Sequence, residues 1–215
     1  LVKFEGKWVT QRELSILRGE WDSAWTHVTT HFRIKTNVSG KFAKRLGVAL
    51  EDAWPVFVEF FGKEPEIEEP MQVLAMKHYE DYRKYCQENG RMNYVNATGF
   101  AMPAKRIVIG YDKLYSQDTL IRTMLHEGAH LFYGVAYRSN VPSWLAEGMA
   151  TYFEGHRLDR KGHVTFDHRA RQRMARLKRA IWARQIMPIE EFFNGKAIEF
   201  INSSANEAGL FYAQA

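Results

Sequence analysis

Hydrophobic and polar positions in the first half of the chain follow two different periods. From His31 to Ser39, apolar Phe32 and Ile34 alternate with charged residues, which predicts a half-buried strand. Residues 41–61 instead repeat apolar residues every three or four positions, which predicts a helix with one buried stripe. Pro55 lies inside this stripe, so we expect a kink or a break in the helix.

Three further elements are predicted before residue 116. The apolar runs MQVLAMK (71–77) and RIVIGY (106–111) indicate strands, and YEDYRKYCQENG (79–90) indicates a helix that ends at Gly90. From Ser116 onward the pattern is mostly helical, and we expect no strong strand after Tyr111. We therefore predict an α+β fold, with an N-terminal mixed β-sheet, helices packed on that sheet, and a helical C-terminal half.

The length of 215 residues accommodates one domain with a full hydrophobic core. We expect a single domain over 1–215, strand-rich to about residue 115 and helical from about 116 onward. The longest apolar runs, such as Val56 to Val58, are too short to span a membrane. The chain begins at Leu1 and ends within a helical pattern, so we expect a form trimmed at both ends. No targeting signal can be read, and the compartment stays open.

Cysteine content and charge exclude some kinds of site. Cys86 is the only cysteine, which excludes an intrachain disulfide and a thiolate cluster, and we expect its thiol to be buried. The net charge of +5 is modest, but residues 157–184 are rich in arginine and lysine. Met174, Leu177 and Ile181 recur at helical spacing, which predicts an amphipathic helix with its basic residues in solvent. A nucleic-acid surface is the alternative, but no aromatic–basic interleaving or nucleic-acid motif supports it.

Two histidines lie four residues apart in the segment TLIRTMLHEGAHLFYGV (119–135). On a helix, His126 and His130 share one face, so both imidazoles can reach one metal ion. Glu127 is rotated by about 100° around the axis and can reach a water on that metal as a general base. The flanking residues are small or apolar, so burial of these three side chains without partners would be costly. Core histidines satisfied by ordinary hydrogen bonds are the alternative.

A catalytic zinc ion takes three protein ligands and keeps one position for water. The segment PSWLAEGMATYFE follows downstream, and Pro142 or Ser143 can start a helix there. Glu147 then lies in an early turn among apolar residues, where its carboxylate needs a cation. A glutamate on the solvated side of a helix start is the alternative. The two histidines and Glu147 favour one Zn²⁺ ion, although their spacing does not prove its identity.

HEGAH followed by WLAEGMATYFE resembles the gluzincin zinc metallopeptidases, and most closely the uncharacterised bacterial peptidase MA-like domains. The order of the segments is similar along most of the chain, from HFRIKTN to FYAQA. The resemblance implies a thermolysin- or aminopeptidase-like zincin domain that hydrolyses peptide bonds. It also implies that His126, His130 and Glu147 bind the zinc ion and that Glu127 is the catalytic base.

The resemblance extends to further positions. Gly99, Phe100 and Ala101 are similar to the edge strand that pairs with the substrate backbone, and a plain loop is the alternative. Tyr212 resembles the tyrosine that stabilises the oxyanion, and simple packing in a C-terminal helix is its alternative. Thr151 lies one turn beyond the third ligand and could orient a ligand, or it could bond its own backbone.

Aminopeptidases of this branch have a glutamate in the edge strand that holds a free α-amine, whereas this chain reads Ala101, Met102 and Pro103 there. That difference favours an endopeptidase that acts on a peptide or protein substrate. A non-catalytic zinc-binding domain that recognises a protein partner is one alternative. A nucleic-acid binder that uses residues 157–184 is the other. The residues do not indicate an oligomeric state or a substrate sequence.

Overall fold

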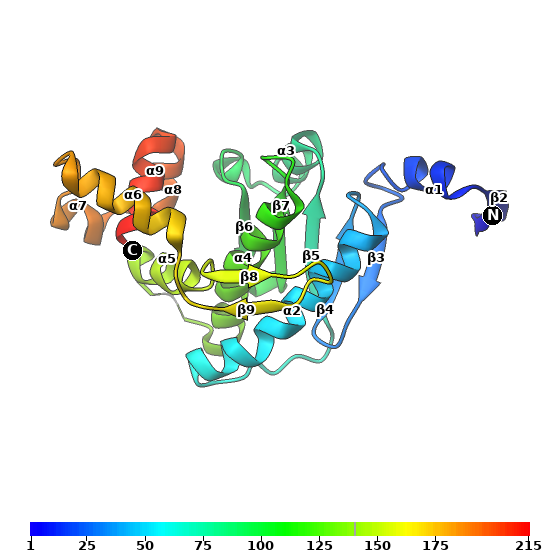
Figure 1. Ribbon diagram of the computed structural model, residues 1–215, viewed down its shortest axis with the longest axis horizontal. Helices are drawn as coiled ribbons and strands as arrows, with labels where there is room; N and C mark the ends of the chain where they lie inside the picture. The colour runs from blue at the N-terminus through cyan, green and yellow to red at the C-terminus, as the bar shows by residue number, and fades with distance from the viewer. Residues whose placement is uncertain (140) are drawn as a thin grey trace.

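A five-stranded mixed sheet forms the centre of the protein in the computed structural model, which describes residues 1–139 and 141–215 (Figure 1). The sheet and the helices on its faces are β3 (Trp25–Val28), β4 (Phe32–Thr36), α2 (Gly40–Phe61), β5 (Met71–Met76), α3 (Tyr79–Glu88), β6 (Gly99–Met102), β7 (Ile107–Tyr111) and α4 (Gln117–Tyr137). The strand order is β3-β4-β5-β7-β6. The two inner pairs are parallel and the two outer pairs are antiparallel, so the predicted α+β class with a mixed sheet is confirmed.

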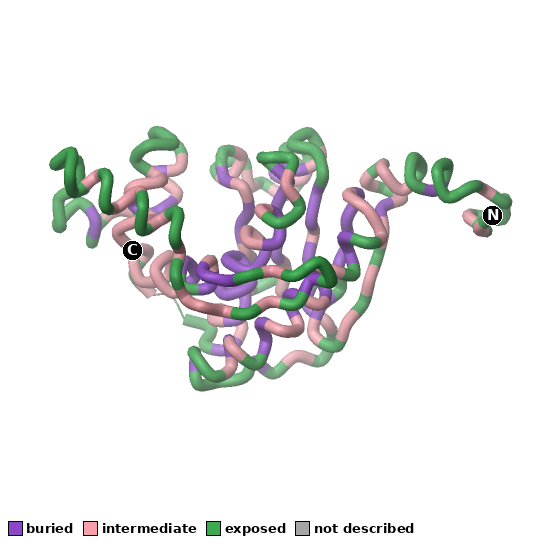
Figure 2. Tube along the Cα trace, in the orientation of Figure 1, coloured by how far each residue is buried: buried purple, intermediate pink, exposed green. Residues whose placement is uncertain are grey.

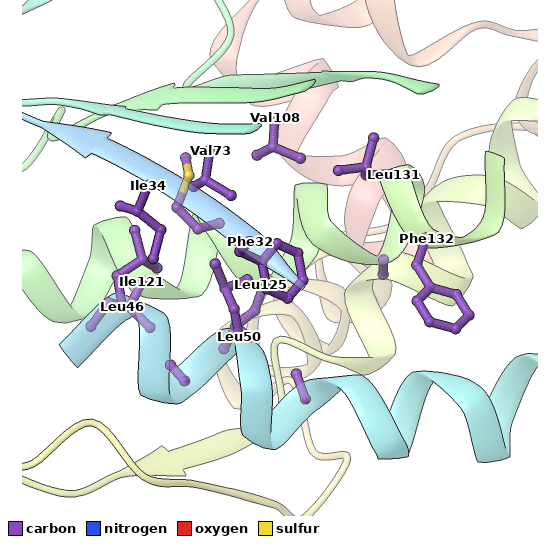
Figure 3. Packing of buried hydrophobic residues seen from close by; sticks show 14 of the residues in the cluster. Phe32, Ile34, Leu46, Leu50, Val73, Val108, Ile121, Leu125, Leu131 and Phe132 are labelled. Carbon is purple, nitrogen blue, oxygen red and sulfur yellow. The ribbon is translucent and has the colours of Figure 1, made fainter. Parts of the chain in front are cut away.

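The main core lies between the sheet and the helices α2 and α4. Phe32 and Ile34 of β4 point toward Leu50 on α2 and toward Ile121 and its neighbours on α4 (Figure 3). The alternation of apolar residues that predicted β4 therefore reflects one face buried against two helices. This packing fixes α4 directly behind the sheet, next to β6 and β7.

A second apolar cluster covers the opposite face of the sheet beneath α3. Tyr82 and Cys86 of α3 are fully buried against Ile109 of β7 and Met76 of β5. The buried thiol agrees with the prediction for Cys86. Because successive strand residues point to opposite faces, β7 contributes Val108 to the first cluster and Ile109 to the second.

Helix α2 is continuous through Pro55, so of the predicted kink or break the break is excluded. The Ser39 hydroxyl caps its start by accepting a hydrogen bond from the Phe42 N–H, and Gly62 ends it with a left-handed φ of 72°. A proline inside a helix costs about 3 kcal/mol. Burial of the helix on both sides of the proline, for example at Phe57, offsets that cost.

The second half of the chain is mostly helical, with one exception. Its elements are α5 (Ser143–Tyr152), β8 (His156–Leu158), β9 (Val164–Phe166), α6 (Arg171–Trp182), α7 (Ile189–Asn194), α8 (Ala197–Ser203) and α9 (Ala205–Gln214). Strands β8 and β9 form an antiparallel hairpin, which adds two short strands to the part of the chain after Tyr111 where we expected no strong strand. Each of these strands has three residues, which is too short for an alternating pattern to stand out.

Helix α6 faces the protein differently from the prediction. Met174 and Ile181, expected on the buried side, are 50% and 54% exposed. Arg173 and Arg176 turn inward instead, and the Arg176 guanidinium donates hydrogen bonds to Asn206. Of the predicted apolar stripe only Leu177 is half-buried, beside Arg173 and Arg176. The helix begins at Arg171 rather than near residue 157.

Helices α7 to α9 enclose a small separate core of Met187, Phe192, Phe200 and Phe211. At the other end of the molecule, β1 (Val2–Phe4), β2 (Lys7–Val9) and α1 (Gln11–Leu17) extend away from the sheet and are largely exposed (Figure 2). Among the described residues, no helix is both long and apolar enough to cross a lipid bilayer.

Candidate metal centre and cleft

The HEGAH segment lies in the buried middle of α4. The Ser116 hydroxyl caps the helix by accepting from the Thr119 N–H, and Asp112 accepts in turn from the Ser116 N–H. His126 is 6% exposed and Glu127 is 9% exposed, so neither side chain has water as its main partner. The prediction that this helix belongs to the core is confirmed.

Helix α5 brings Glu147 to the two histidines. Glu147 Oε2 lies 3.1 Å from His126 Nε2 and 3.2 Å from His130 Nε2. The ligand atoms of the three residues all lie within 4.8 Å of one another, so this group could hold a metal ion. Ligand atoms about 2.0–2.2 Å from one tetrahedral ion stand roughly 3.4 Å apart, close to the separations found here.

Two carboxylates surround the buried imidazole of His126. Burial alone would lower its pKa, but the hydrogen bond to Glu147 and the adjacent carboxylate of Glu154 outweigh this effect and raise the pKa to about 10. Burial likewise raises the pKa of Glu147, yet the two histidines hold it well below its usual range. The site therefore favours a cation between these groups, which is either a proton on imidazole or a bound metal ion.

Glu154 was not assigned a role from the sequence. Its Oε1 lies 3.0 Å from His126 Nδ1, a close contact whose geometry falls short of a hydrogen bond. Burial raises the pKa of Glu154, but His126 and Arg173 outweigh it and lower the pKa to about 2. Glu154 lies beyond the end of α5 at Tyr152, so helical spacing from Glu147 did not indicate its position.

Glu127 lies at the wall of a cleft of about 690 Å³, together with His130 and Glu147. Burial is the largest influence on Glu127 and raises the pKa of its carboxyl above the usual value. A carboxylate with a raised pKa accepts and returns a proton closer to neutral pH than an exposed one does.

Strand β6 forms the edge of the sheet and lines the same cleft with Gly99, Phe100 and Ala101. The segment is an antiparallel strand paired with β7, so the alternative of a plain loop is excluded. Being at the edge, β6 leaves one row of backbone groups without a strand partner in the sheet. Asn202 of α8 accepts from the Asn96 side chain and joins the C-terminal helices to the segment before this strand.

Helix α9 brings Tyr212 to the cleft. A Cβ on Gly148 of α5 would stand 2.6 Å from the Ala215 carbonyl oxygen, so glycine permits the close packing of α9 on α5. The Tyr212 ring lies 5.9 Å from the His126 ring and lines the cleft. Burial and the carboxylates of Glu147 and Glu127 raise the pKa of Tyr212 well above its ordinary value, so its hydroxyl remains a hydrogen-bond donor.

Thr151 is also near this region of α5, and its side chain is buried. Its hydroxyl makes no hydrogen bond to any residue in the described ranges. The role of orienting a ligand therefore stays a prediction for Thr151, whereas Glu154 makes the contact with His126 that such a role requires.

No protein-family model matches the chain, and no curated protein is significantly similar to it. What the site can do is therefore inferred from its own residues and their geometry.

Proposed function

We propose that the protein is a zinc-dependent endopeptidase with a thermolysin- or aminopeptidase-like zincin catalytic domain. The convergence of two imidazole nitrogens with the Glu147 carboxylate oxygen, beside the buried Glu127 and in the wall of a cleft, carries this proposal. Burial of these carboxylates and imidazoles together would be costly without a cation between them, so the cluster favours a bound metal ion over a purely structural role.

The donor set fits zinc. Two neutral imidazoles and one carboxylate are a common ligand set for catalytic zinc, which leaves a fourth position open. Nδ1 of His126 lies 3.0 Å from Glu154 Oε1, which leaves Nε2 as the ring nitrogen that faces Glu147 and could bind the ion. A bound zinc ion would supply Lewis acidity and would lower the pKa of a coordinated water toward neutrality.

The residues around the ligands have complementary roles in this proposal. Glu127 accepts a proton from the attacking water and returns it to the leaving amine. Tyr212 keeps its proton and donates a hydrogen bond to the oxygen that becomes negative in the transition state. The edge strand β6 binds an extended substrate backbone by adding it to the sheet.

The charges of the cleft support cleavage inside a chain rather than removal of an N-terminal residue. Among the described residues that line it, the charged side chains are Glu127, Glu147 and Lys196, besides His130. Both carboxylates already have roles in the proposed reaction. Recognition of a free α-ammonium group would require a further carboxylate.

The test is digestion of a diverse peptide library by the parent protein and by the variant Glu127→Gln, read by mass spectrometry. We expect cleavage at internal bonds by the parent, loss of at least about 100-fold in rate in the variant, and equal zinc content in both. Equal cleavage by the two proteins would remove Glu127 from the mechanism. Zinc binding by both without any cleavage would favour a non-catalytic domain that recognises a partner.

A further inference from the structure

Arg173 of α6 points toward the site rather than toward solvent. Its Nε donates to Glu154 Oε2 at 2.9 Å, and its Nη2 donates to Glu154 Oε1 at 2.8 Å. Both oxygens of the carboxylate are therefore held in the plane of the guanidinium, a geometry that fixes the orientation of the acid. The same acid contacts His126 Nδ1, so Arg173 is connected to a candidate metal ligand through one side chain.

The same guanidinium also lies over the ring of Tyr212, with Arg173 Cζ 4.8 Å from the ring centroid. A flat guanidinium can use its edge for a carboxylate and its face for an aromatic ring at the same time. A lysine ammonium has no such plane and cannot hold both partners in this way.

We propose that Arg173 is a positioning residue that sets the place of Tyr212 in the cleft and the orientation of Glu154 behind His126. The inference rests on the proposed function, because it names the group that places two parts of that machinery. Three elements distant in the sequence meet at this one side chain: Glu154 after α5, Arg173 on α6, and Tyr212 on α9.

Charge within the site supports this role. Glu127, Glu147 and Glu154 are three largely buried carboxylates in one region. Arg173 offsets one of these charges, and a bound divalent ion would offset the other two. An unpaired Glu154 would turn toward water or toward the histidines, because a buried carboxylate without a partner is costly.

Arg176 provides a matched control on the same helix. It lies three residues farther along α6, and its guanidinium donates to the backbone oxygen and to the side-chain oxygen of Asn206 on α9. It therefore fastens α6 to α9 without contact to Glu154 or Tyr212. A loss that came only from loosening α6 would appear in Arg176→Met as well as in Arg173→Met.

The kinetic test compares Arg173→Met, Tyr212→Phe and the double variant at saturating zinc. We expect Arg173→Met to lower kcat about 10- to 100-fold, as loss of a group that orients an active-site residue does. In the Tyr212→Phe background the same change should have a smaller effect, because the hydroxyl to be positioned is absent and only the part that acts through Glu154 remains. Arg173→Lys should resemble Arg173→Met, whereas Arg176→Met should retain the parent kcat.

The second measurement, the NMR signal of the Tyr212 ring, does not depend on peptidase activity. The tyrosine rings are labelled with ¹³C, the Tyr212 signal is assigned by its loss in Tyr212→Phe, and spectra are recorded without metal. We expect the Tyr212 signal to shift in Arg173→Met and to keep its position in Arg176→Met. If the parent cleaves no peptide, the proposed function fails while this spectrum still decides the role of Arg173.

Three results would overturn the inference. One is an unchanged Tyr212 signal in Arg173→Met. Another is an equal loss of kcat in the parent and Tyr212→Phe backgrounds, which would mean that the two residues act independently. The third is full activity in Arg173→Lys, which would reduce the role of Arg173 to its charge.

Discussion

Gly99 of β6 lies so close to Glu127 of α4 that a Cβ at position 99 would stand 3.2 Å from Glu127 Cγ. The same Cβ would stand 2.7 Å from the backbone oxygen of Ile109 on the neighbouring strand. The absence of a side chain at position 99 therefore allows the candidate base and the edge strand to lie side by side. Substrate bound along β6 would meet the carboxylate directly.

Gly99→Ala should therefore weaken both the fold and the activity. The strand must move away from rigid backbone, and overpacking of this kind costs about 1–3 kcal/mol in unfolding free energy. Gly128→Ala is the stability control, because a Cβ there meets Leu50 at 3.5 Å, an ordinary contact. Denaturant unfolding and peptide cleavage are measured for both variants. Parent-like stability of Gly99→Ala would show that β6 and α4 adjust without cost.

Zinc should stabilise the protein through Glu147. A ligand that binds only the folded state at 100 times its dissociation constant adds about 2.7 kcal/mol. We expect zinc to raise the melting temperature of the parent, a chelator to reverse the increase, and Glu147→Ala to lose most of it. Glu199→Ala, which changes an exposed acid on α8, should respond as the parent does. An undiminished response in Glu147→Ala would exclude that residue as a ligand.

The parts of the site that could be predicted depend on short sequence distances. His126, Glu127 and His130 lie within two turns of one helix, so their spacing alone brings them to one region. Strands β4, β5 and β7 and helix α2 were also predictable, because each buries apolar residues at one clear period. Local spacing and burial were sufficient for these elements.

The parts that could not be predicted depend on contacts between distant segments. Arg173 belongs to a basic run that is typical of a solvated face. Only the fold shows that its guanidinium donates hydrogen bonds to Glu154. Met174 and Ile181 lie at helical spacing but remain exposed, so periodicity did not indicate the buried side of α6. The helical pattern likewise could not show that α2 continues through Pro55.

Tyr212→Phe should lower kcat with little change in KM or zinc affinity. The phenol hydroxyl would act only on charge that develops in the transition state, and loss of one such donor costs about 100- to 1,000-fold in kcat. Tyr152→Phe is the control, because that ring stacks on Phe60 and His168 and does not line the cleft. A change confined to KM would indicate that Tyr212 binds the substrate equally well in the ground state and in the transition state.

Glu51 of α2 pairs with His31, the residue before β4. Glu51 Oε2 lies 2.6 Å from His31 Nδ1, its Oε1 accepts from the His31 N–H at 2.8 Å, and the imidazole stacks on Trp54. Partial burial raises the pKa of Glu51, but hydrogen bonds from Thr29 and His31 outweigh it, so the pKa in the folded protein is lowered.

A lowered pKa in the folded state means that the unfolded chain takes up the proton first as the pH falls. Glu51 therefore stabilises the fold above the unfolded pKa of about 4.3, and this contribution is lost as the pH falls through the folded pKa. The difference in unfolding free energy between the parent and Glu51→Gln should be largest near pH 7 and should shrink below about pH 4. Glu59→Gln, which changes an exposed acid on the same helix, should follow the pH dependence of the parent. A difference that stays constant from pH 7 to pH 3 would show that Glu51 acts through packing rather than through its charge.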